Sequence, residues 1–514
     1  MICAPHARAA NPFRSDTNSL GLSRDLGPDL GRDRGVSASA AHNALHHSGR
    51  VLLWQGLETV AQLACDAPHI RPTDYGLGDA WCDTALRQDP RMHIDGRYVS
   101  RQPAGRVGAD APDDPGRFHG KCGALRPDPP KRALLTCDAL RRTVANLMTK
   151  FALTPLAATL PSTVPFVGPE TQERAMDRAF DARLGANESV FGPSPKALAA
   201  MKAAEIWMYG DPENYDLRLA LAGHHGISAD HIIVGEGIDG LLGYLVRLFV
   251  GQGDAVVTSD GAYPTFNYHA VGFGGTLHKV PYKDDHEDPV ALFFKAKEVG
   301  AKLVYLANPD NPMGSWHDGA TIKAALDDLP DGTLLILDEA YIDCAPVGTA
   351  PNIAADDPRV IRLRTFSKAY GLAGARVGYA IGAPDLIAAF NKVRNHFGMN
   401  RAAQSGALAA LADQTYLQTV VSKIETARQT ISEIGRENGL IPLPSATNFV
   451  ALDCGRDGAH AKAVLGGLVA RGIFVRMPFS APQNRCIRVS CGTDLNLSTL
   501  RRILPDAIAA AEKG

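Results

Sequence analysis

Residues 364–378 read RTFSKAYGLAGARVG, and they lie where one apolar segment of strand length, 360–363, ends and the next, 377–381, begins. The loop between the two predicted strands is polar and rich in glycine, and it carries a single lysine, Lys368. A lysine that attacks a carbonyl must be unprotonated, and partial burial together with Arg376 lowers its pKa toward that form. Ser367 and Arg376 can hold a phosphate beside it.

The tripeptide Ser-Lys-Ala alone is typical of an ordinary solvated loop, but the fifteen-residue context is more specific. It resembles the cofactor-lysine motif of class I/II aminotransferases, in the form found in histidinol-phosphate aminotransferases. The resemblance implies that pyridoxal 5'-phosphate is the cofactor and that Lys368 forms a Schiff base with it. It also places Thr365, Ser367 and Arg376 among the cofactor contacts.

A carboxylate and a tyrosine follow the apolar run 334–337. By itself, an aspartate after a strand is often only a helix cap. A carboxylate against a pyridine nitrogen keeps that nitrogen protonated, and a phenol can hydrogen-bond the ring oxygen. The resemblance gives these two roles to Asp338 and Tyr341, about thirty residues before the lysine.

Residues 307–314 read ANPDNPMG and form a predicted tight turn after the strand 303–306. An Asn-Pro turn in isolation is usually structural. Related enzymes read Asn-Pro-x-Asn-Pro-Thr-Gly, so the resemblance makes Asn311 a hydrogen-bond donor to the cofactor ring oxygen. Met313 departs from that pattern, at a position to which we assign no chemistry.

Two further motifs fit the phosphate and the ring face of the cofactor. Residues 235–240, GEGIDG, connect a predicted strand to a helix, and the main chain of Gly237, Ile238 and Asp239 can bind an anion at the helix N-terminus. Such turns are common without any ligand. Tyr263 follows the strand 255–258, where the family stacks a tyrosine on the pyridine ring.

Two arginines lie on predicted C-terminal strands. A guanidinium binds carboxylate or phosphate through two parallel hydrogen bonds, so Arg488 suits a substrate α-carboxylate, and Arg488 with Arg476 suits a substrate phosphate. Strand arginines are otherwise mostly salt-bridge partners. Residues 184–195 resemble the N-terminal substrate segment of the histidinol-phosphate subgroup, with Asn187 and with Phe191 where that subgroup often has tyrosine.

Apolar runs of strand length alternate with amphipathic stretches from about residue 180, which indicates α/β units around a mainly parallel sheet. The resemblance implies the type I fold of pyridoxal-phosphate enzymes, with a mixed, mostly parallel seven-stranded sheet in a large domain and a smaller α/β domain. We expect the large domain at 218–415. The smaller domain combines 416–514 with 148–217, which also supplies a dimer arm, since Tyr209 matches a tyrosine that in relatives reaches the neighbouring subunit's cofactor phosphate.

Residues 1–147 are rich in Arg, Asp, Pro, Gly, Ala and His and have little apolar periodicity. We interpret them as a disordered extension or as sequence upstream of a true start at Met148. A cofactor-sensing transcription regulator, which carries the same fold behind a DNA-binding domain, is an alternative for a chain with such an extension. The segment lacks a helix-turn-helix pattern or a basic recognition helix.

Composition points to a small-molecule enzyme of the cytoplasm. The formal net charge of −2 provides no basic excess for nucleic acid or membrane lipids. No apolar run reaches the length of a membrane span, the start has no secretion signal, and nine scattered cysteines without metal-site spacing read as reduced thiols. We expect no metal.

The expected reaction is transfer of an amino group between an amino acid or histidinol phosphate and 2-oxoglutarate, within amino-acid biosynthesis such as that of histidine. Arg476 with Arg488 favours the phosphorylated substrate, while Phe191 in place of tyrosine leaves room for an aromatic amino acid aminotransferase. Threonine-phosphate decarboxylase shares these motifs and remains a further alternative.

Overall fold

The structure is a computed structural model that describes residues 152–162 and 166–513. The predicted extension 1–147 and the proposed start at Met148 lie outside the described residues. A seven-stranded sheet organises the large domain, in the order β2-β8-β7-β6-β5-β3-β4. Its strands are β2 (Ile232–Gly235), β3 (Ala255–Ser259), β4 (Thr276–Val280), β5 (Leu303–Ala307), β6 (Leu334–Asp338), β7 (Val360–Thr365) and β8 (Gly378–Ile381).

The sheet is mixed and mostly parallel. The neighbours from β4 to β7 pair in parallel, and β8 alone runs against its neighbours β2 and β7. The central strands β5 and β6 are buried at every position, because helices cover both faces and leave no place for an alternating polar residue. The predicted α/β fold with a mixed seven-stranded sheet is confirmed.

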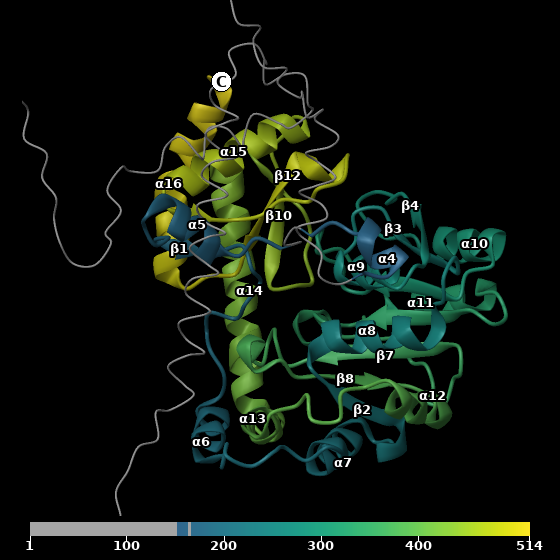
Figure 1. Ribbon diagram of the computed structural model, residues 1–514. Coiled ribbons are helices and arrows are strands. Elements are labelled where there is room, and N and C mark those ends of the chain that lie inside the picture. Colours follow the sequence, from purple (N-terminus) through teal and green to yellow (C-terminus); the bar gives the residue numbers. More distant parts are fainter. Residues whose placement is uncertain (1–151, 163–165, 514) are drawn as a thin grey trace, which may run out of the picture. The chain divides into compact units, whose positions relative to one another are not determined.

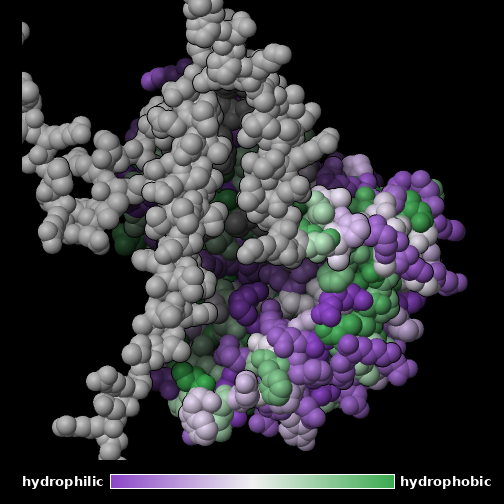
Figure 2. Space-filling view, in the orientation of Figure 1, coloured by the Kyte–Doolittle hydropathy of each residue, from purple (hydrophilic) through white to green (hydrophobic). Residues whose placement is uncertain are grey.

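Alternate residues of the central strands feed two separate cores. Leu303 and Tyr305 pack with α8 (Gly237–Phe249), α9 (Thr265–Gly272) and α12 (Pro384–Ala389), whereas Val304 and Leu306 pack with α10 (Pro289–Val299) and α11 (Gly319–Ala325). This alternation follows from the two-residue repeat of a strand. Figure 2 shows that the visible outer face of the described residues is mostly hydrophilic, with hydrophobic side chains in smaller groups.

The smaller domain is built around the antiparallel sheet β12-β10-β9, and β1 pairs in parallel with β11. Figure 1 shows α5 and β1, from the start of the described chain, among these C-terminal elements. The strands and main helices of the smaller domain are β1 (Ala182–Arg183), β9 (Ile441–Pro442), β10 (Phe449–Asp453), β11 (Ile473–Phe474), β12 (Cys486–Ser490), α14 (Gln414–Glu437), α15 (Gly458–Ala470) and α16 (Asp494–Glu512). The other α-helices are α4 (Pro155–Thr159), α5 (Pro169–Met176), α6 (Pro195–Ala203), α7 (Tyr215–His225) and α13 (Arg401–Leu411).

The two helices α13 and α14 follow each other closely in the sequence, and a break at residues 412–413 separates them. Asp413 has a non-helical backbone at this break, and its carboxylate accepts hydrogen bonds from Ser194 and from Lys196. This contact ties the helix break to the start of α6. In the part of the chain that the structure describes, no helix is both long and apolar enough to cross a bilayer.

Candidate active site

A pocket lies at the carboxyl ends of β5, β6 and β7, where side chains from successive loops of a parallel sheet meet. Lys368, Asp338, Tyr341 and Asn311 all line it. The remaining lining residues are Ile238, Asp239, Tyr263, Tyr305, Ala307, Pro309, Ala340, Thr365, Ser367 and Arg376. The loops that carry these motifs are far apart in the sequence but line the same pocket.

Lys368 lies in the turn that follows β7. Its Nζ donates to the carbonyl of Asn187 at 3.4 Å and stands 5.2 Å from the centre of the Tyr341 ring. Burial lowers the pKa of this ammonium group, and Arg488 and Arg376 act in the same direction, while Tyr263 and Asp239 oppose them. The lowered pKa favours the neutral, nucleophilic form of the amine.

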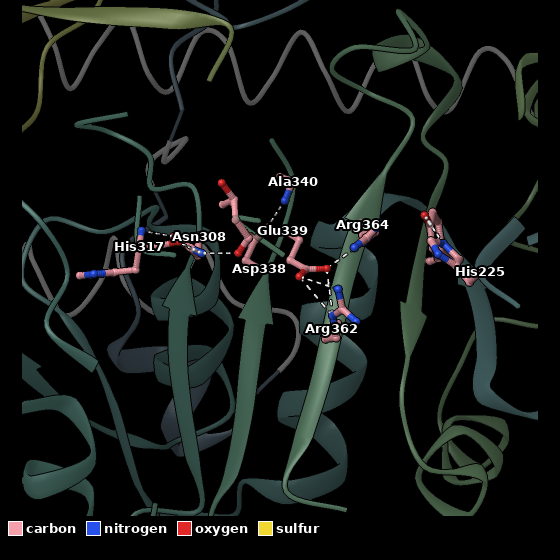
Figure 3. Close-up of polar contacts among 10 residues, drawn as sticks. His225, Asn308, His317, Asp338, Glu339, Ala340, Arg362 and Arg364 are labelled. Atoms are coloured by element: carbon pink, nitrogen blue, oxygen red, sulfur yellow. Dashed lines mark hydrogen bonds and ion pairs between the residues drawn. The ribbon is translucent and has the colours of Figure 1, made fainter. Parts of the chain in front are cut away.

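Asp338 is the last residue of β6 and is 5% exposed. Its Oδ2 accepts from the Tyr305 hydroxyl at 2.7 Å and its Oδ1 accepts from the backbone N–H of Ala340 at 2.9 Å, the contact drawn in Figure 3. Burial raises the pKa of this carboxyl to about 6, although both hydrogen bonds act against the rise. A cation placed against the carboxyl would hold it ionised, so the site suits a protonated ring nitrogen.

Glu339, the next residue, points to the other side of β6 (Figure 3). Its fully buried carboxylate accepts from Arg362 Nη2 at 2.9 Å and from Arg364 Nε at 2.7 Å. Both arginines lie on β7, so this ion cluster joins the end of β6, where Asp338 lies, to the strand that precedes Lys368. Successive side chains along a strand point to opposite faces, so Asp338 faces the pocket while Glu339 binds the arginines of the neighbouring strand.

A hydrogen-bond network connects four of the predicted residues. The Tyr341 hydroxyl accepts from Asn187 Nδ2 at 3.0 Å and from Asn311 Nδ2 at 3.4 Å. Asn311 Oδ1 in turn accepts from Arg488 Nη1. Arg488 also donates to the carbonyl of Gly185 at 3.1 Å, and its buried Nε finds no partner among the described residues.

The turn predicted to cradle the phosphate lies where α8 begins. Glu236 precedes the helix without making a side-chain cap, so the first backbone N–H groups of α8 remain available. Arg376 lies over this end, 3.3 Å from Ser367 Oγ and 3.3 Å from Asp239 Oδ2. Gly237 has φ of +76°, and a Cβ there would stand 2.5 Å from Arg376 Nη2. The cradle therefore requires glycine at this position.

Thr365 fixes the hydroxyl groups of the cradle. Its Oγ1 accepts from the backbone N–H of Ser367 at 3.1 Å and lies 2.9 Å from Ser367 Oγ. Thr365 Oγ1 also donates to the carbonyl of Val377 at 3.0 Å. The ends of β7 and β8 are thereby held at the spacing that brings Ser367 and Arg376 together.

Tyr263 and Arg476 meet a segment that the motifs did not single out. The ring of Tyr263 stacks against Phe166, with centroids 6.3 Å apart and planes at 25°. Arg476 donates to the carbonyl of Val167 at 2.7 Å and stands opposite Arg488 in an antiparallel bridge. Phe166 and Val167 carry no periodic or motif signal, so the sequence pattern could not have placed them here.

Phe191 and Tyr209 do not line the pocket of this chain. Phe191 packs against the hydrophobic core, where its carbonyl accepts from the Tyr416 hydroxyl at 3.0 Å. Tyr209 is 79% exposed and contacts Phe397, with ring centroids 5.0 Å apart. The structure therefore does not bring these two predicted residues to the site within one subunit.

Three residues that the sequence reasoning missed support the site. Tyr305 bonds Asp338, Asn448 Nδ2 donates to the carbonyl of Asn187 at 2.9 Å, and Ser490 Oγ donates to Asn187 Oδ1 at 2.7 Å. A usable signal existed for Tyr305, because a tyrosine inside an otherwise aliphatic buried strand requires a hydrogen-bond partner. Asn448 and Ser490 had no such signal.

These residues fit pyridoxal 5'-phosphate. An uncapped helix end with Arg376 and Ser367 suits its phosphate, a buried carboxyl suits its ring nitrogen, and Lys368 offers an amine with no acidic partner within the described residues. The family model for aminotransferase class I and II matches residues 182–504. The chain belongs to the class I and II aminotransferases. It is thus an enzyme that depends on pyridoxal 5'-phosphate and acts on small molecules.

Several relatives of this aminotransferase are named for histidinol phosphate. The chain is 35% identical over 319 residues to histidinol-phosphate aminotransferase 1 of Mesorhizobium japonicum, covering 61% of this chain and 86% of the relative. It is 34% identical to the histidinol-phosphate aminotransferase of an Anaeromyxobacter species, covering 68% and 98% of the two chains. The solved structure of histidinol-phosphate aminotransferase from Sinorhizobium meliloti in complex with pyridoxal-5'-phosphate is 53% identical, with a TM-score of 0.69, and the match covers 71% of this chain and 99% of that one.

Proposed function

We propose that this aminotransferase moves the amino group of histidinol phosphate to 2-oxoglutarate and thereby serves histidine biosynthesis. The observation that carries the proposal is a pair of partly buried arginines. Within the described residues, Arg476 and Arg488 bond only carbonyl oxygens and the Asn311 amide, with no carboxylate on either. Burial lowers the pKa of both guanidinium groups, and each is brought close to the other by the bridge between their strands.

Two neighbouring guanidinium groups without acids repel each other until an anion arrives. A phosphate binds guanidinium forks through several oxygens, so a phosphorylated substrate gains more from this pair than a neutral side chain does. The names of the relatives above support the same substrate. Histidinol phosphate itself has no α-carboxylate, which leaves Arg488 available to its phosphate.

The residues of the chain divide the work of the reaction. The cofactor supplies an electron-accepting ring when bound. Lys368 takes the proton from substrate Cα, Asp338 holds the ring nitrogen in its protonated form, and Tyr341 with Asn311 donates to the ring oxygen. Tyr263 stacks on the ring face, and Gly237, Ile238 and Asp239 supply backbone donors for the phosphate.

The experiment compares kcat/KM for histidinol phosphate, phenylalanine and other amino acids with 2-oxoglutarate. The proposal predicts that histidinol phosphate is the best donor and that Arg476→Met lowers its kcat/KM more than that of phenylalanine. Arg471→Met, which removes an arginine bonded to a helix carbonyl at 3.0 Å, serves as the matched control. A histidinol-phosphate rate no better than the others contradicts the proposal, and CO2 release from threonine phosphate would favour the decarboxylase.

The aromatic amino acid alternative rested on Phe191. Because Phe191 packs against the core and does not line the pocket around Lys368, its missing hydroxyl opens no space at that pocket. Phenylalanine therefore stays in the assay as a comparison substrate, and no contact of the described chain favours it over histidinol phosphate.

We further propose a homodimer in which Tyr209 reaches the partner's cofactor phosphate. Tyr209 lies in an exposed apolar group, since Ile206 and Trp207 are 78% and 79% exposed and Phe397 is 57% exposed. Large apolar side chains gathered in this way mark an interaction surface. Light scattering is expected to give twice the chain mass, and Trp207→Asp is expected to give monomers that bind the cofactor weakly.

A cytoplasmic location completes the proposal. The described cysteines, Cys344, Cys454, Cys486 and Cys491, are all buried free thiols, as expected in a reducing compartment. Recovery of the enzyme with membranes or outside the cell would contradict this location.

A further inference from the structure

The side chain of Asn187 links three separate parts of the described chain. Asn187 lies between β1 and α6, it is 2% exposed, and its φ is +57°. Asparagine tolerates this left-handed conformation better than most residues do. Its amide contacts Ser490 at the end of β12 and Tyr341 after β6, which are 3% and 4% exposed. These contacts join the smaller domain to the pocket of the large domain.

The Ser490 hydroxyl makes two hydrogen bonds to this one residue. Its Oγ accepts from the backbone N–H of Asn187 at 3.0 Å and donates to Asn187 Oδ1 at 2.7 Å. Because the hydroxyl proton needs an acceptor, it draws the oxygen end of the amide to the Ser490 side. The nitrogen end then points the other way, and Asn187 Nδ2 donates to the Tyr341 hydroxyl at 3.0 Å.

The backbone of Asn187 is held as well as its side chain. Its carbonyl accepts from Asn448 Nδ2 at 2.9 Å and from Lys368 Nζ at 3.4 Å. Asn448 is 1% exposed and comes directly before β10. Asn187 can therefore neither turn its peptide nor exchange the two ends of its amide without breaking a buried hydrogen bond.

Tyr341 receives a second donor of the same kind. Asn311 Nδ2 donates to its hydroxyl at 3.4 Å, and Arg488 Nη1 donates to Asn311 Oδ1 and so fixes the direction of that amide. The phenol oxygen accepts from two amides, and its own proton has no acceptor among the described residues. Burial raises the pKa of Tyr341, so the hydroxyl keeps this proton. Since Tyr341 lines the pocket, the proton is available to an acceptor bound there.

A reversed Asn187 amide would have the opposite effect. Its Oδ1 would face Tyr341 and accept the phenol proton, which would then be lost to the pocket. Ser490 would face the NH2 group instead, and its own proton would be left without an acceptor at a buried position. The Ser490 hydroxyl therefore decides which end of the amide Tyr341 meets.

We propose that Ser490 is a positioning residue that fixes the direction of the Asn187 amide, so that the Tyr341 proton stays free for the ring oxygen of the cofactor. This inference rests on the proposed role of Tyr341 at that oxygen. It gives Ser490 no contact with the substrate or the cofactor, because its effect reaches the ring only through Asn187 and Tyr341.

The experiment titrates the visible absorbance of the full-length holoenzyme with pH, in the absence of substrate. A donor to the ring oxygen stabilises its anion, so loss of the donor raises the midpoint of the titration. Tyr341→Phe should raise the midpoint by about one pH unit or more. Ser490→Ala should raise it by at least about 0.3 unit, because at most half of the Asn187 amides then keep the donating direction.

The controls separate the hydroxyl from the fold. Ser490→Thr keeps a hydroxyl and should have the wild-type midpoint. Thr333→Ala removes a buried hydroxyl that donates to the Ala301 carbonyl at 2.7 Å, at the other end of β6, and should leave the midpoint unchanged. If Ser490→Ala does not fold, Ser490→Cys puts a weakly donating thiol in the same place and should shift the midpoint in the same direction.

A double variant tests the route of the effect. Adding Ser490→Ala to Tyr341→Phe should produce no further shift. An unshifted midpoint in Ser490→Ala, or an equal shift in both backgrounds, overturns the proposal. An unshifted midpoint in Tyr341→Phe removes Tyr341 from the ring oxygen and overturns it as well. Because no substrate is present, an error in the assignment of histidinol phosphate would alter none of these midpoints.

Discussion

Replacement of Glu339 by glutamine tests how the two strands under the site are joined. The Glu339 carboxylate is fully buried between Arg362 and Arg364, whose side chains are 15% and 14% exposed. Removing one partner of a buried ion cluster costs about 3 to 5 kcal/mol, because the remaining charges stay uncompensated. Since glutamine keeps one acceptor oxygen, we expect a loss near the lower end, about 3 kcal/mol.

The assay is urea unfolding of the holoenzyme at neutral pH and at acidic pH. Burial acts to raise the pKa of Glu339, but Arg364 and Arg362 outweigh it and hold the pKa below its usual value. A lowered folded pKa adds stability above the unfolded pKa, and this stability is lost as pH falls through the folded pKa. The difference between wild type and variant should therefore shrink on acidification.

The matched control is Glu298→Gln, which removes an ion pair with Lys295 in which the glutamate is 54% exposed. Exposed pairs contribute about 0 to 1 kcal/mol. A loss below about 1 kcal/mol for Glu339→Gln, or a loss equal to that of the control, would refute the reasoning.

Three further changes test other parts of the site. Gly237→Ala should weaken binding of pyridoxal 5'-phosphate by about 1 to 3 kcal/mol, because φ at this position is +76° and Arg376 occupies the space of a Cβ. The measurement is the dissociation constant of the cofactor. The control Gly240→Ala, where an added Cβ would have its nearest contact at 3.3 Å, should bind the cofactor nearly as the wild type does. Tyr305→Phe removes a hydrogen-bond donor to Asp338 and so raises the pKa of that carboxyl. The acidic limb of the pH profile of kcat/KM should therefore move to higher pH. An acidic limb at the same pH would show that Asp338 is not the group that titrates there. A chain that starts at Met148 should keep full transaminase activity, and its loss would give the extension a catalytic role.

The strand-end motifs could be predicted because each one joins an apolar run to polar residues, and parallel strands bring such ends to one edge. Asp338 ends β6, Asn311 and Lys368 follow β5 and β7, and all three line one pocket. Met313, which departs from the family pattern, packs in a small core with Ala451 and Cys486. Its side chain therefore contributes packing between the loop and the C-terminal sheet.

Other features depend on contacts that no local pattern encodes. Glu287 accepts from the backbone N–H of Ala307 across a loop, and Phe166 stacks on Tyr263 from nearly a hundred residues upstream. The substrate role of Phe191 was predicted because relatives often have a tyrosine at this position. That resemblance did not determine where the phenylalanine packs. Side-chain contacts over such separations arise only when the domains fold together.

The central claim is that the buried amine of Lys368 carries the cofactor. The most direct measurement is the visible absorption spectrum of purified wild type and of Lys368→Ala after addition of pyridoxal 5'-phosphate. The wild type should be yellow and lose its colour on borohydride reduction with the cofactor attached to Lys368 by mass spectrometry, whereas the variant should take up no covalent cofactor. An identical spectrum and the same mass gain in both proteins would contradict the account.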